Sequence, residues 1–287
     1  MSITSLFKAD KTVVSFEIFP PKRDGTLINL QHTIKSLKSH NPDFISVTFG
    51  AGGTGLDAST WDIARSIKES YSIEPLVHLT CISHSKEDID HILEKLCKYG
   101  LYNILALRGD KSPDNPPKKN FTYASDLISY IQAQGDFSIS AACYPEGHPE
   151  SKNLVQDTLN LKKKVDAGAS HLISQLFFDN DMFYSFLDRA RIAGINVPVD
   201  AGIMPVVNKN QIERMVTLCG ASLPKKFRKM LDKYEDKPDA LRDAGVAYAI
   251  DQIVDLISQG VDGIHLYTMN NPIIAERIYN GFSSLIG

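Results

Sequence analysis

The stretch Val13-Val-Ser-Phe-Glu-Ile-Phe-Pro-Pro21 decides the fold, because it has the pattern of a buried strand with one polar side. Successive side chains of a strand point to opposite faces. The even-numbered positions from Val14 to Ile18 are all apolar, whereas Ser15 and Glu17 share the other face. The two prolines end the strand, since proline has no N–H to give to a sheet. We expect the apolar face to pack against helices and the face with Glu17 to point inward.

Similar apolar runs recur along the chain, and most are separated by stretches with helical periodicity. The spacing of Leu30, Ile34 and Leu37, for example, predicts a helix after the first strand. Strands that alternate with helices indicate βαβ units and a parallel sheet, and eight such units favour a (β/α)8 TIM barrel of the α/β class. The alternative is an open doubly wound sheet, but no G-x-G-x-x-G motif follows the first run. The eight predicted strands are Val13–Phe19, Phe44–Phe49, Leu76–Thr80, Ile104–Leu107, Phe137–Cys143, Leu172–Leu176, Val197–Ala201 and Gly263–Tyr267.

The interval between the seventh and eighth strands is much longer than the others. It contains two extra stretches of helical character, Pro224–Tyr234 and Ala240–Gln259. Because no linker or low-complexity tract accompanies them, we interpret them as insertions into the barrel. We therefore expect one catalytic barrel domain over residues 1–287, without a regulatory domain.

Composition excludes several classes of function. The 287 residues are 43% hydrophobic and 23% charged, as in an ordinary globular protein. Lys+Arg of 31 against Asp+Glu of 34 leaves a net charge of −3, which argues against nucleic-acid binding. No apolar run is long enough to cross a bilayer, and no basic segment followed by an apolar one opens the chain. We expect neither membrane insertion nor secretion.

The four cysteines indicate a reducing compartment and no metal site. Cys81, Cys97, Cys143 and Cys219 are widely spaced, form no CxxC motif and have no histidine at zinc-site spacing. Isolated thiols of this kind usually behave as small apolar side chains. We expect a cytoplasmic protein.

Glu17 is the strongest candidate for a catalytic residue. It lies near the carboxyl end of the first strand on the inward face, and barrel active sites lie at that end. A carboxyl group in this position is costly to bury unless it is protonated or has a partner. A structural glutamate paired with a buried cation is the alternative.

Other polar residues also stand at or just after the ends of predicted strands. Any one of them is more often a satisfied core group than a catalytic residue, but together they predict a polar pocket. By strand alternation, Arg108 and Asp110 share a face with Ile104 and Ala106. The remaining residues in this class are Thr48, His78, Thr80, Tyr144, Gln175, His265 and Tyr267.

Two segments suggest a bound nucleotide. The glycine-rich turn at residues 50–55 follows the second strand and would let the backbone approach a phosphate or a flat ring. It matches neither a P-loop nor a Rossmann fingerprint, and an ordinary tight strand-to-helix turn is the alternative. In the predicted helix near 153–167, Leu154, Thr158, Leu161 and Val165 form the expected core face, and Asp157, Asn160 and Lys164 form a second stripe. The default interpretation of that stripe is solvated charge. With the aromatic ring, imidazole and hydroxyl of residues 144–151 just upstream, it would also suit a nucleotide cofactor.

Six motifs in order along the chain resemble the bacterial 5,10-methylenetetrahydrofolate reductase family. They are Phe16-Glu-Ile-Phe-Pro-Pro-Lys22, Leu107-Arg-Gly-Asp110, Tyr144-Pro-Glu-Gly-His-Pro-Glu150, Asp166-Ala-Gly-Ala169 with Gln175-Leu-Phe-Phe-Asp179, Gly202-Ile-Met-Pro-Val206 and Tyr267-Thr-Met-Asn270. The resemblance runs from about residue 15 to near the end of the chain. It implies a flavin-dependent TIM barrel in which NAD(P)H reduces bound FAD and leaves. Methylenetetrahydrofolate then receives a hydride and becomes 5-methyltetrahydrofolate, a methyl source for methionine synthesis. It also implies a homo-oligomer.

The resemblance assigns roles to individual residues. Glu17 matches the general acid, which protonates N10 of the folate and opens its five-membered ring to an iminium cation that accepts hydride. Asp110 matches a second catalytic residue, close to flavin and pterin, that stabilises the developing charge. Asp110, Gln175, Gln211 and Asn271 match the folate-binding positions. The positions matching FAD contacts are Thr48, Phe49, His78, Arg108, Gly109, Asp110, Ala124, Tyr144, His148, Ser151, Asp157, Asn160, Lys163 and Lys164.

Two positions depart from the family pattern. Met215 stands where relatives can carry Phe, and Asn271 stands where relatives can carry Arg, which would hold the glutamate tail of the folate. Asn cannot form a bidentate pair with a carboxylate; Lys209 is a candidate substitute. Two alternatives stay open: another flavin-dependent barrel with a different substrate, and a folate- or flavin-binding subunit that receives electrons from an iron–sulfur partner.

Overall fold

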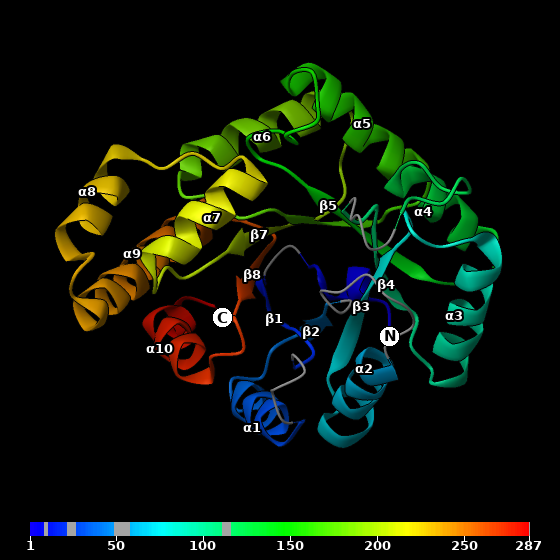
Figure 1. The fold of residues 1–287 in the computed structure, drawn as a ribbon, viewed down its shortest axis with the longest axis horizontal. Coiled ribbons are helices and arrows are strands. Elements are labelled where there is room, and N and C mark those ends of the chain that lie inside the picture. The colour runs from blue at the N-terminus through cyan, green and yellow to red at the C-terminus, as the bar shows by residue number, and fades with distance from the viewer. Residues whose placement is uncertain (9–10, 22–26, 49–57, 111–115, 287) are drawn as a thin grey trace.

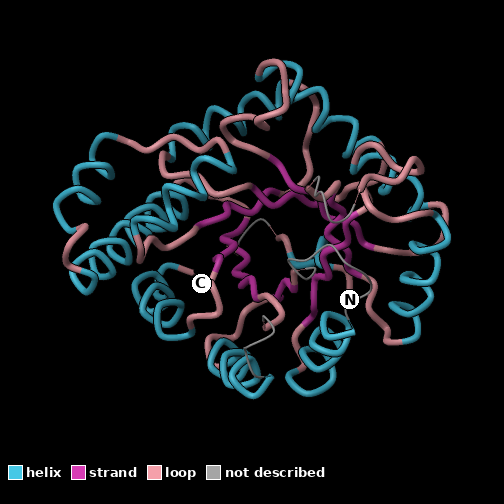
Figure 2. The backbone as a smooth tube through the Cα atoms, viewed as in Figure 1, coloured by secondary structure: helices cyan, strands magenta, loops and turns pink. Residues whose placement is uncertain are grey.

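The chain folds into a closed barrel of eight parallel strands, each joined to its sequence neighbours in the order β1 to β8 (Figures 1 and 2). The computed structural model describes residues 1–8, 11–21, 27–48, 58–110 and 116–286, apart from the side chains at 27, 58–59, 209–211, 214 and 218. The predicted (β/α)8 barrel is confirmed, and the open-sheet alternative is wrong. The strands are β1 (Val13–Ile18), β2 (Phe44–Val47), β3 (Glu74–Thr80), β4 (Asn103–Leu107), β5 (Ser138–Cys143), β6 (His171–Ser174), β7 (Val199–Ile203) and β8 (Gly263–Tyr267).

Helices surround the barrel on its outside (Figure 2). The predicted insertion between β7 and β8 is confirmed, because three helices stand there: α7, α8 and α9. Phe227 of α8 packs in a satellite apolar cluster with Leu241 of α9 and Met204 after β7. The helices are α1 (Leu27–Lys38), α2 (Ala58–Tyr71), α3 (Lys86–Lys98), α4 (Ala124–Gln132), α5 (Leu154–Asp166), α6 (Asn180–Ile192), α7 (Lys209–Cys219), α8 (Lys225–Tyr234), α9 (Pro238–Ser258) and α10 (Pro272–Phe282). None of the described helices is long and apolar enough to span a membrane.

The first and last strands close the barrel. β1 pairs with β2 on one side and with β8 on the other, with Glu17 opposite Ser46 and Tyr267 respectively. Strand β7 begins and ends two residues later than predicted, because Pro198 stands before it and has no N–H for the ladder. The other predicted strands differ from the observed ones mainly by a residue or two at their ends.

The apolar core has two layers that follow the alternation of the strands. Val14, Phe16 and Ile18 belong to the large cluster between strands and helices, as predicted. Val13 points the other way and meets Phe44, Leu76, Leu105 and Ile173 inside the barrel.

The amino terminus covers the end of the barrel where the strands begin. A short 3-10 helix, η1 (Ile3–Leu6), places Ile3 in the interior cluster, where 1% of its surface is exposed. The Ile3 N–H donates to Asn103 Oδ1 at 2.9 Å, at the start of β4. This leaves the opposite end, where the strands finish, for a binding cavity.

Candidate active site

A cavity of about 960 Å³ lies where the strands end. The described residues that line it come from the ends of β1, β3 to β6 and β8 and from the segments that follow β2 to β8, including Met204 after β7. Among the residues singled out from the sequence, the cavity brings together Glu17, Thr48, His78, Thr80, Arg108, Gly109, Asp110, Ala124, Tyr144, His148, Ser151, Asp157, Asn160, Lys163, Lys164, Gln175, Met215 and Tyr267. Phe49, the turn at 50–55 and the side chain of Gln211 lie outside the described part of the chain.

Asn271 is not among the residues that line this cavity. It is the N-cap of α10, and its side-chain oxygen accepts from the Ile274 N–H at 3.2 Å. The residue therefore stabilises a helix end, as asparagine commonly does.

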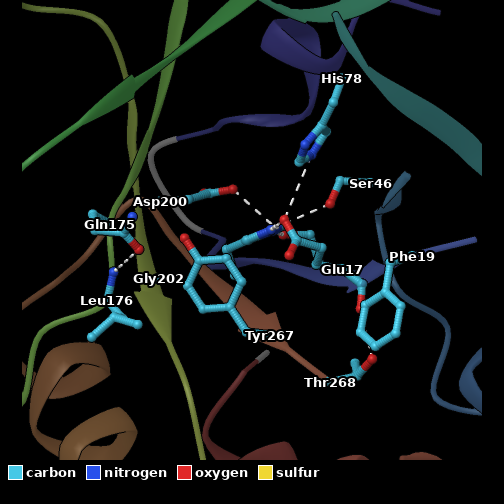
Figure 3. A network of polar contacts seen from close by, with 12 residues as sticks. Glu17, Phe19, Ser46, His78, Gln175, Leu176, Asp200, Gly202, Tyr267 and Thr268 are labelled. Atoms are coloured by element: carbon cyan, nitrogen blue, oxygen red, sulfur yellow. Dashed lines mark hydrogen bonds and ion pairs between the residues drawn. The ribbon is translucent and has the colours of Figure 1, made fainter. Parts of the chain in front are cut away.

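Glu17 faces two imidazole rings at the base of the cavity. Its Oε2 lies 3.6 Å from His78 Nε2 and 3.7 Å from His265 Nε2, and 19% of its side chain is exposed. Figure 3 shows His78 pointing at Glu17 from β3. Burial lowers the pKa of His78 to about 4, against a weaker opposing effect of Glu17. His78 is therefore neutral near pH 7, so the inward carboxyl group is not neutralised by a cation at this position.

The segment after β8 fixes the backbone at Glu17 and directly after it. Thr268 Oγ1 donates to the Glu17 carbonyl at 2.6 Å. The Asn270 side chain pairs with both backbone groups of Phe19, donating at 2.8 Å and accepting at 3.1 Å. Met269 and Asn270 adopt left-handed backbone angles, with φ of 51° and 53°. Such angles are uncommon for residues other than glycine and mark an over-determined turn.

Tyr267 forms the wall beside Glu17. Its hydroxyl donates to the Ser174 carbonyl at 2.7 Å, and Figure 3 shows the ring between Glu17 and Gln175. Gly202 makes room for this arrangement: a Cβ there would lie 2.2 Å from the Ser174 oxygen and 2.8 Å from the Tyr267 ring. Burial raises the pKa of Tyr267 well above its ordinary value, so the phenol stays neutral.

Gln175 presents an amide at the side of the cavity. Its Oε1 accepts from the Leu176 N–H at 2.9 Å, as drawn in Figure 3. Because the amide oxygen already accepts this bond, the NH2 group of Gln175 is left to donate to a ligand.

A group of cationic and aromatic side chains occupies the part of the cavity between β4 and α5. Arg108 forms a two-bond pair with Glu150, at 2.6 and 2.8 Å. Lys164 donates to the Ala142 carbonyl at 2.8 Å, and burial lowers the pKa of this lysine. Tyr144 and His148 pack edge to face with ring centres 4.7 Å apart. Partly buried cations beside aromatic rings suit an anionic ligand with a flat ring system.

Helix α5 turns its polar stripe toward the cavity. Asp157, Asn160 and Lys164 line it, so the polar stripe faces the cavity. The expected core face is only partly correct: Leu161 is buried, but Leu154 is 41% exposed. Leu154 is the first residue of the helix, directly after an exposed N-cap, and there are few neighbours to cover a first turn.

The strand alternation used for Arg108 needs correction. Ile104 and Ala106, which share its parity, pack outward in the large core cluster, whereas Leu105 faces the interior. Arg108 reaches the cavity because β4 has already ended at Leu107 and Gly109 turns the chain with φ of 86°. A Cβ at Gly109 would lie 3.1 Å from Thr80 Cβ, so the turn fits tightly against β3.

Sequence reasoning missed the groups that surround Glu17 from other strands. Ser46 and Asp200 were not singled out, and Thr268 and Asn270 appeared only within a family motif without a role, although all four lie in or beside its polar network. Asp200 had a usable signal, since a carboxylate between Val199 and Ala201 in an apolar strand requires an explanation. The described residues contain no group of three acidic, cysteine or histidine side chains that could hold a metal ion.

Comparison with known proteins identifies the family. The sequence profile described as methylenetetrahydrofolate reductase matches residues 2–282. The chain belongs to this family. It is 39% identical over 265 residues to 5,10-methylenetetrahydrofolate reductase of Pectobacterium carotovorum and 38% identical over 266 residues to that of Escherichia coli K12. These alignments cover 92% and 93% of this chain and 88% of each relative.

Another relative is longer than this chain, and two solved structures share only its fold. Methylenetetrahydrofolate reductase (NADH) 1 of Arabidopsis thaliana is 36% identical, and the alignment covers 93% of this chain but 48% of that protein. A protein from Clostridium thermocellum, whose structure is described as binding two copies of 5-methyl-5,6,7,8-tetrahydrofolic acid, superposes with a TM-score of 0.64 at 15% identity over 96% of each chain. Tryptophan synthase of Mycobacterium tuberculosis superposes with a TM-score of 0.60 at 10% identity over 99% of this chain and 97% of that one. The last two show the barrel fold alone. Membership of the reductase family makes this chain an oxidoreductase.

Proposed function

We propose that this member of the methylenetetrahydrofolate reductase family reduces 5,10-methylenetetrahydrofolate to 5-methyltetrahydrofolate, with NAD(P)H as electron donor and FAD as cofactor. The product would supply methyl groups for methionine synthesis. The observation that carries the proposal is Glu17, an inward carboxyl group at the base of the cavity beside a neutral His78. Family membership supports the choice of substrate.

The residues between β4 and α5 fit FAD. Its diphosphate is anionic, and Arg108, His148 and Lys164 supply cationic or hydrogen-bonding groups on that side of the cavity. Lys164 is partly buried, and the acceptor that it has among the described residues is the Ala142 carbonyl, so an anion would stabilise its charged form. Tyr144 offers an aromatic surface beside them. The flavin supplies reversible two-electron chemistry when bound, and the protein's part is to hold and orient it.

Glu17 would act on the folate as a general acid. The bridging methylene group is a poor hydride acceptor until its five-membered ring opens, and ring opening requires a proton on the departing nitrogen. A neutral carboxyl group can give that proton at Oε2. Thr268 and Asn270 hold the backbone at the Glu17 carbonyl and at Phe19, which supports a fixed position of Glu17 before a ligand arrives.

Asp110 and Gln175 would orient the substrate. Both line the cavity that contains Glu17. The carboxylate of Asp110 would accept from pterin N–H groups and stabilise the cation that forms on ring opening. The NH2 group of Gln175 would donate to a pterin acceptor. Gln211 and Asn271 remain proposed folate-binding positions through the family resemblance alone.

We extend the proposal to the setting of the enzyme. Residues 1–287 would act as one catalytic barrel domain within a homo-oligomer. All four cysteines are free thiols, two of them fully buried, which supports a reducing cytoplasm.

The decisive experiment compares the two half-reactions of a Glu17→Gln variant. Flavin absorbance is followed anaerobically, first with NADH or NADPH and then with methylenetetrahydrofolate. We expect flavin reduction to be unchanged within about twofold and reoxidation by folate to fall about 10²- to 10⁴-fold. Glu146→Gln is the matched control, since Glu146 lies outside the cavity lining and accepts from the Ser222 N–H at 3.0 Å.

Each other outcome has a definite meaning. Full folate reduction by Glu17→Gln would remove this residue from the chemistry. A flavin that the pyridine nucleotides reduce but the folate cannot reoxidise, in the unsubstituted protein, would favour a flavin-dependent barrel with another substrate. A flavin that neither nucleotide reduces would favour a subunit supplied with electrons by a partner.

A further inference from the structure

Glu150 occupies Arg108, the cavity residue whose guanidinium group can form two parallel hydrogen bonds with an oxyanion. Arg108 Nη1 donates to Glu150 Oε2 at 2.6 Å, and Nη2 donates to Oε1 at 2.8 Å. The Nε group donates to the Gly109 carbonyl at 3.2 Å. One edge of the guanidinium group therefore holds a carboxylate, and Nε on the other edge already has an acceptor. A phosphate that binds Arg108 through two bonds has to take the place of Glu150.

The two partners of this ion pair differ in their exposure to solvent. The side chain of Arg108 is 19% exposed, whereas that of Glu150 is 53% exposed. They come from different loops, because Arg108 directly follows β4 and Glu150 lies between β5 and α5. A half-exposed carboxylate loses little when it returns to water, since solvent-exposed ion pairs contribute little to stability. Glu150 is therefore the partner that can leave the pair at low cost.

The groups around Arg108 favour a ligand with more negative charge than one carboxylate. The charge of Arg108 contributes to lowering the pKa of both His148 and Lys164, although burial is the larger cause for each. The three groups therefore lie close enough for their charges to interact, and all three line the cavity. A diphosphate carries more charge than Glu150, so it would attract this group of side chains more strongly.

His148 provides a hydrogen-bond donor beside the pair. Its Nδ1 accepts from the Glu150 N–H at 3.1 Å, and a backbone N–H can only donate. A neutral imidazole carries a single N–H, so the proton of His148 is on Nε2. Burial lowers the pKa of His148, which favours this neutral form near pH 7. Because the contact uses the backbone of Glu150, rotation of the Glu150 side chain would leave this donor in place.

We infer that Glu150 is a positioning residue that competes with an anionic cofactor for Arg108. The inference rests on the proposed function for the identity of that cofactor, FAD. As the diphosphate binds, the Glu150 carboxylate would rotate into solvent and Arg108 would pair with the diphosphate. The exchange breaks and forms hydrogen bonds only, without a covalent step. Glu150 would therefore weaken cofactor binding and favour cofactor release.

Glu150→Gln tests the competition, and Glu146→Gln is the matched control. Both glutamates lie between β5 and α5, but the Glu146 carboxylate lies outside the cavity lining and accepts from the Ser222 N–H at 3.0 Å. The Kd for FAD is measured by diluting the holoenzyme and following the fluorescence of released flavin. We expect Glu150→Gln to lower this Kd about three- to tenfold and Glu146→Gln to leave it unchanged within about twofold. An unchanged or raised Kd for Glu150→Gln would overturn the inference.

A double-mutant cycle separates competition for Arg108 from simple charge repulsion. If Glu150 acts through Arg108, Glu150→Gln should change the Kd for FAD less than about twofold in an Arg108→Gln background. Tighter binding that persists in that background would overturn the inference, because Glu150 would then repel the cofactor without competing for Arg108.

Failure of this inference can be told apart from failure of the proposed function. Glu17→Gln tests the folate chemistry, whereas Glu150→Gln is read by flavin binding without turnover. If the purified protein carries no flavin, calorimetric titration with inorganic pyrophosphate replaces the dilution assay, and tighter binding by Glu150→Gln is again expected. That result would show FAD to be wrong and the competition at Arg108 to be correct. Equal pyrophosphate binding by Glu150→Gln and the unsubstituted protein would overturn the inference.

Discussion

At the scale of single residues, His78 makes the stability of the fold depend on pH. Burial lowers its pKa from the ordinary 6.5 to about 4. The pKa of His78 is lower in the folded state than in the unfolded state. Its contribution to the free energy of unfolding is therefore complete above pH 6.5 and is lost as the pH falls toward 4. We expect the free energy of unfolding to fall by roughly 2 kcal/mol between about pH 7 and about pH 5 through this residue. Urea unfolding of His78→Gln should show a flatter pH dependence, whereas the exposed His91→Gln should not.

Single residues also show how far strand alternation carries a site prediction. Alternation places Glu17 correctly because it lies inside β1, where the pleat fixes which way each side chain points. It fails for Arg108, which follows the last residue of β4, where Gly109 and not the pleat sets the direction. Strand alternation also does not predict which residues are in contact, since Ser15 and His265 are in contact but lie 250 positions apart in the sequence. Polar contacts between distant strands depend on the register of the closed barrel, which the periodicity of one strand does not contain.

At the scale of elements, a capping box stabilises the N-terminus of α3. Ser85 accepts from the Asp88 N–H at 3.2 Å, and Asp88 accepts from the Ser85 N–H at 2.7 Å, which is a capping box. Ser85→Ala should lower the free energy of unfolding by about 1 kcal/mol, because a helix N–H loses its acceptor. Thermal unfolding would measure the loss, with Ser129→Ala on the exposed side of α4 as the control. An equal effect at both serines would contradict a role for the cap.

The same cap has a pH dependence of its own. A hydrogen bond from Lys118, followed by the Ser85 N–H, holds the pKa of Asp88 below its ordinary range. The folded-state pKa is the lower one, so this contribution is present above the ordinary pKa near 3.8 and is lost as the pH falls below it. We expect Asp88→Asn to lower the free energy of unfolding at neutral pH. On acidification the free energy of unfolding of this variant should fall less than that of the unsubstituted chain, and acid unfolding would measure the difference.

Element positions were predictable to the extent that periodicity decides them. The helix positions followed from apolar spacing, and the insertion after β7 from the long interval before β8. The ends of elements were less predictable, as in β7, where Pro198 delays the ladder. The exposed first residue of α5, Leu154, shows the same limit: spacing predicts which side of a helix is apolar but not how far the neighbouring elements extend along it.

At the scale of the whole molecule, the amino terminus closes the end of the barrel opposite the cavity. Ile3 is buried there against Val13 and Leu76. Ile3→Ala should lower the free energy of unfolding by about 2–4 kcal/mol, through lost burial and the cavity left behind. Ile28→Ala, at a position 63% exposed, should have little effect in the same urea titration. We expect flavin binding to be unchanged in both, and a loss of flavin from Ile3→Ala alone would show that the two ends are coupled.

The closed barrel was predictable by counting strands, but this closure by η1 was not. A helix of four residues has too few positions to show a period. Its role follows from the contacts of the amino terminus with the starts of three strands. Ile3 of η1 bonds to Asn103 of β4, and Met1 and Ser2 just before it contact Glu74 of β3 and Ser138 of β5.

The pairing of β1 with β8 has a consequence for how the protein folds during its synthesis. Contacts between distant parts of a chain form slowly in folding, since a long loop must close first. Glu17 is made near the start of synthesis, whereas His265, Thr268 and Asn270 are made near its end. A nascent or shortened chain that lacks the final strand would leave Glu17 at an open sheet edge without these neighbours. The site proposed for proton transfer is therefore complete only when β8 closes the barrel, and a ribosome-bound fragment without β8 should lack it.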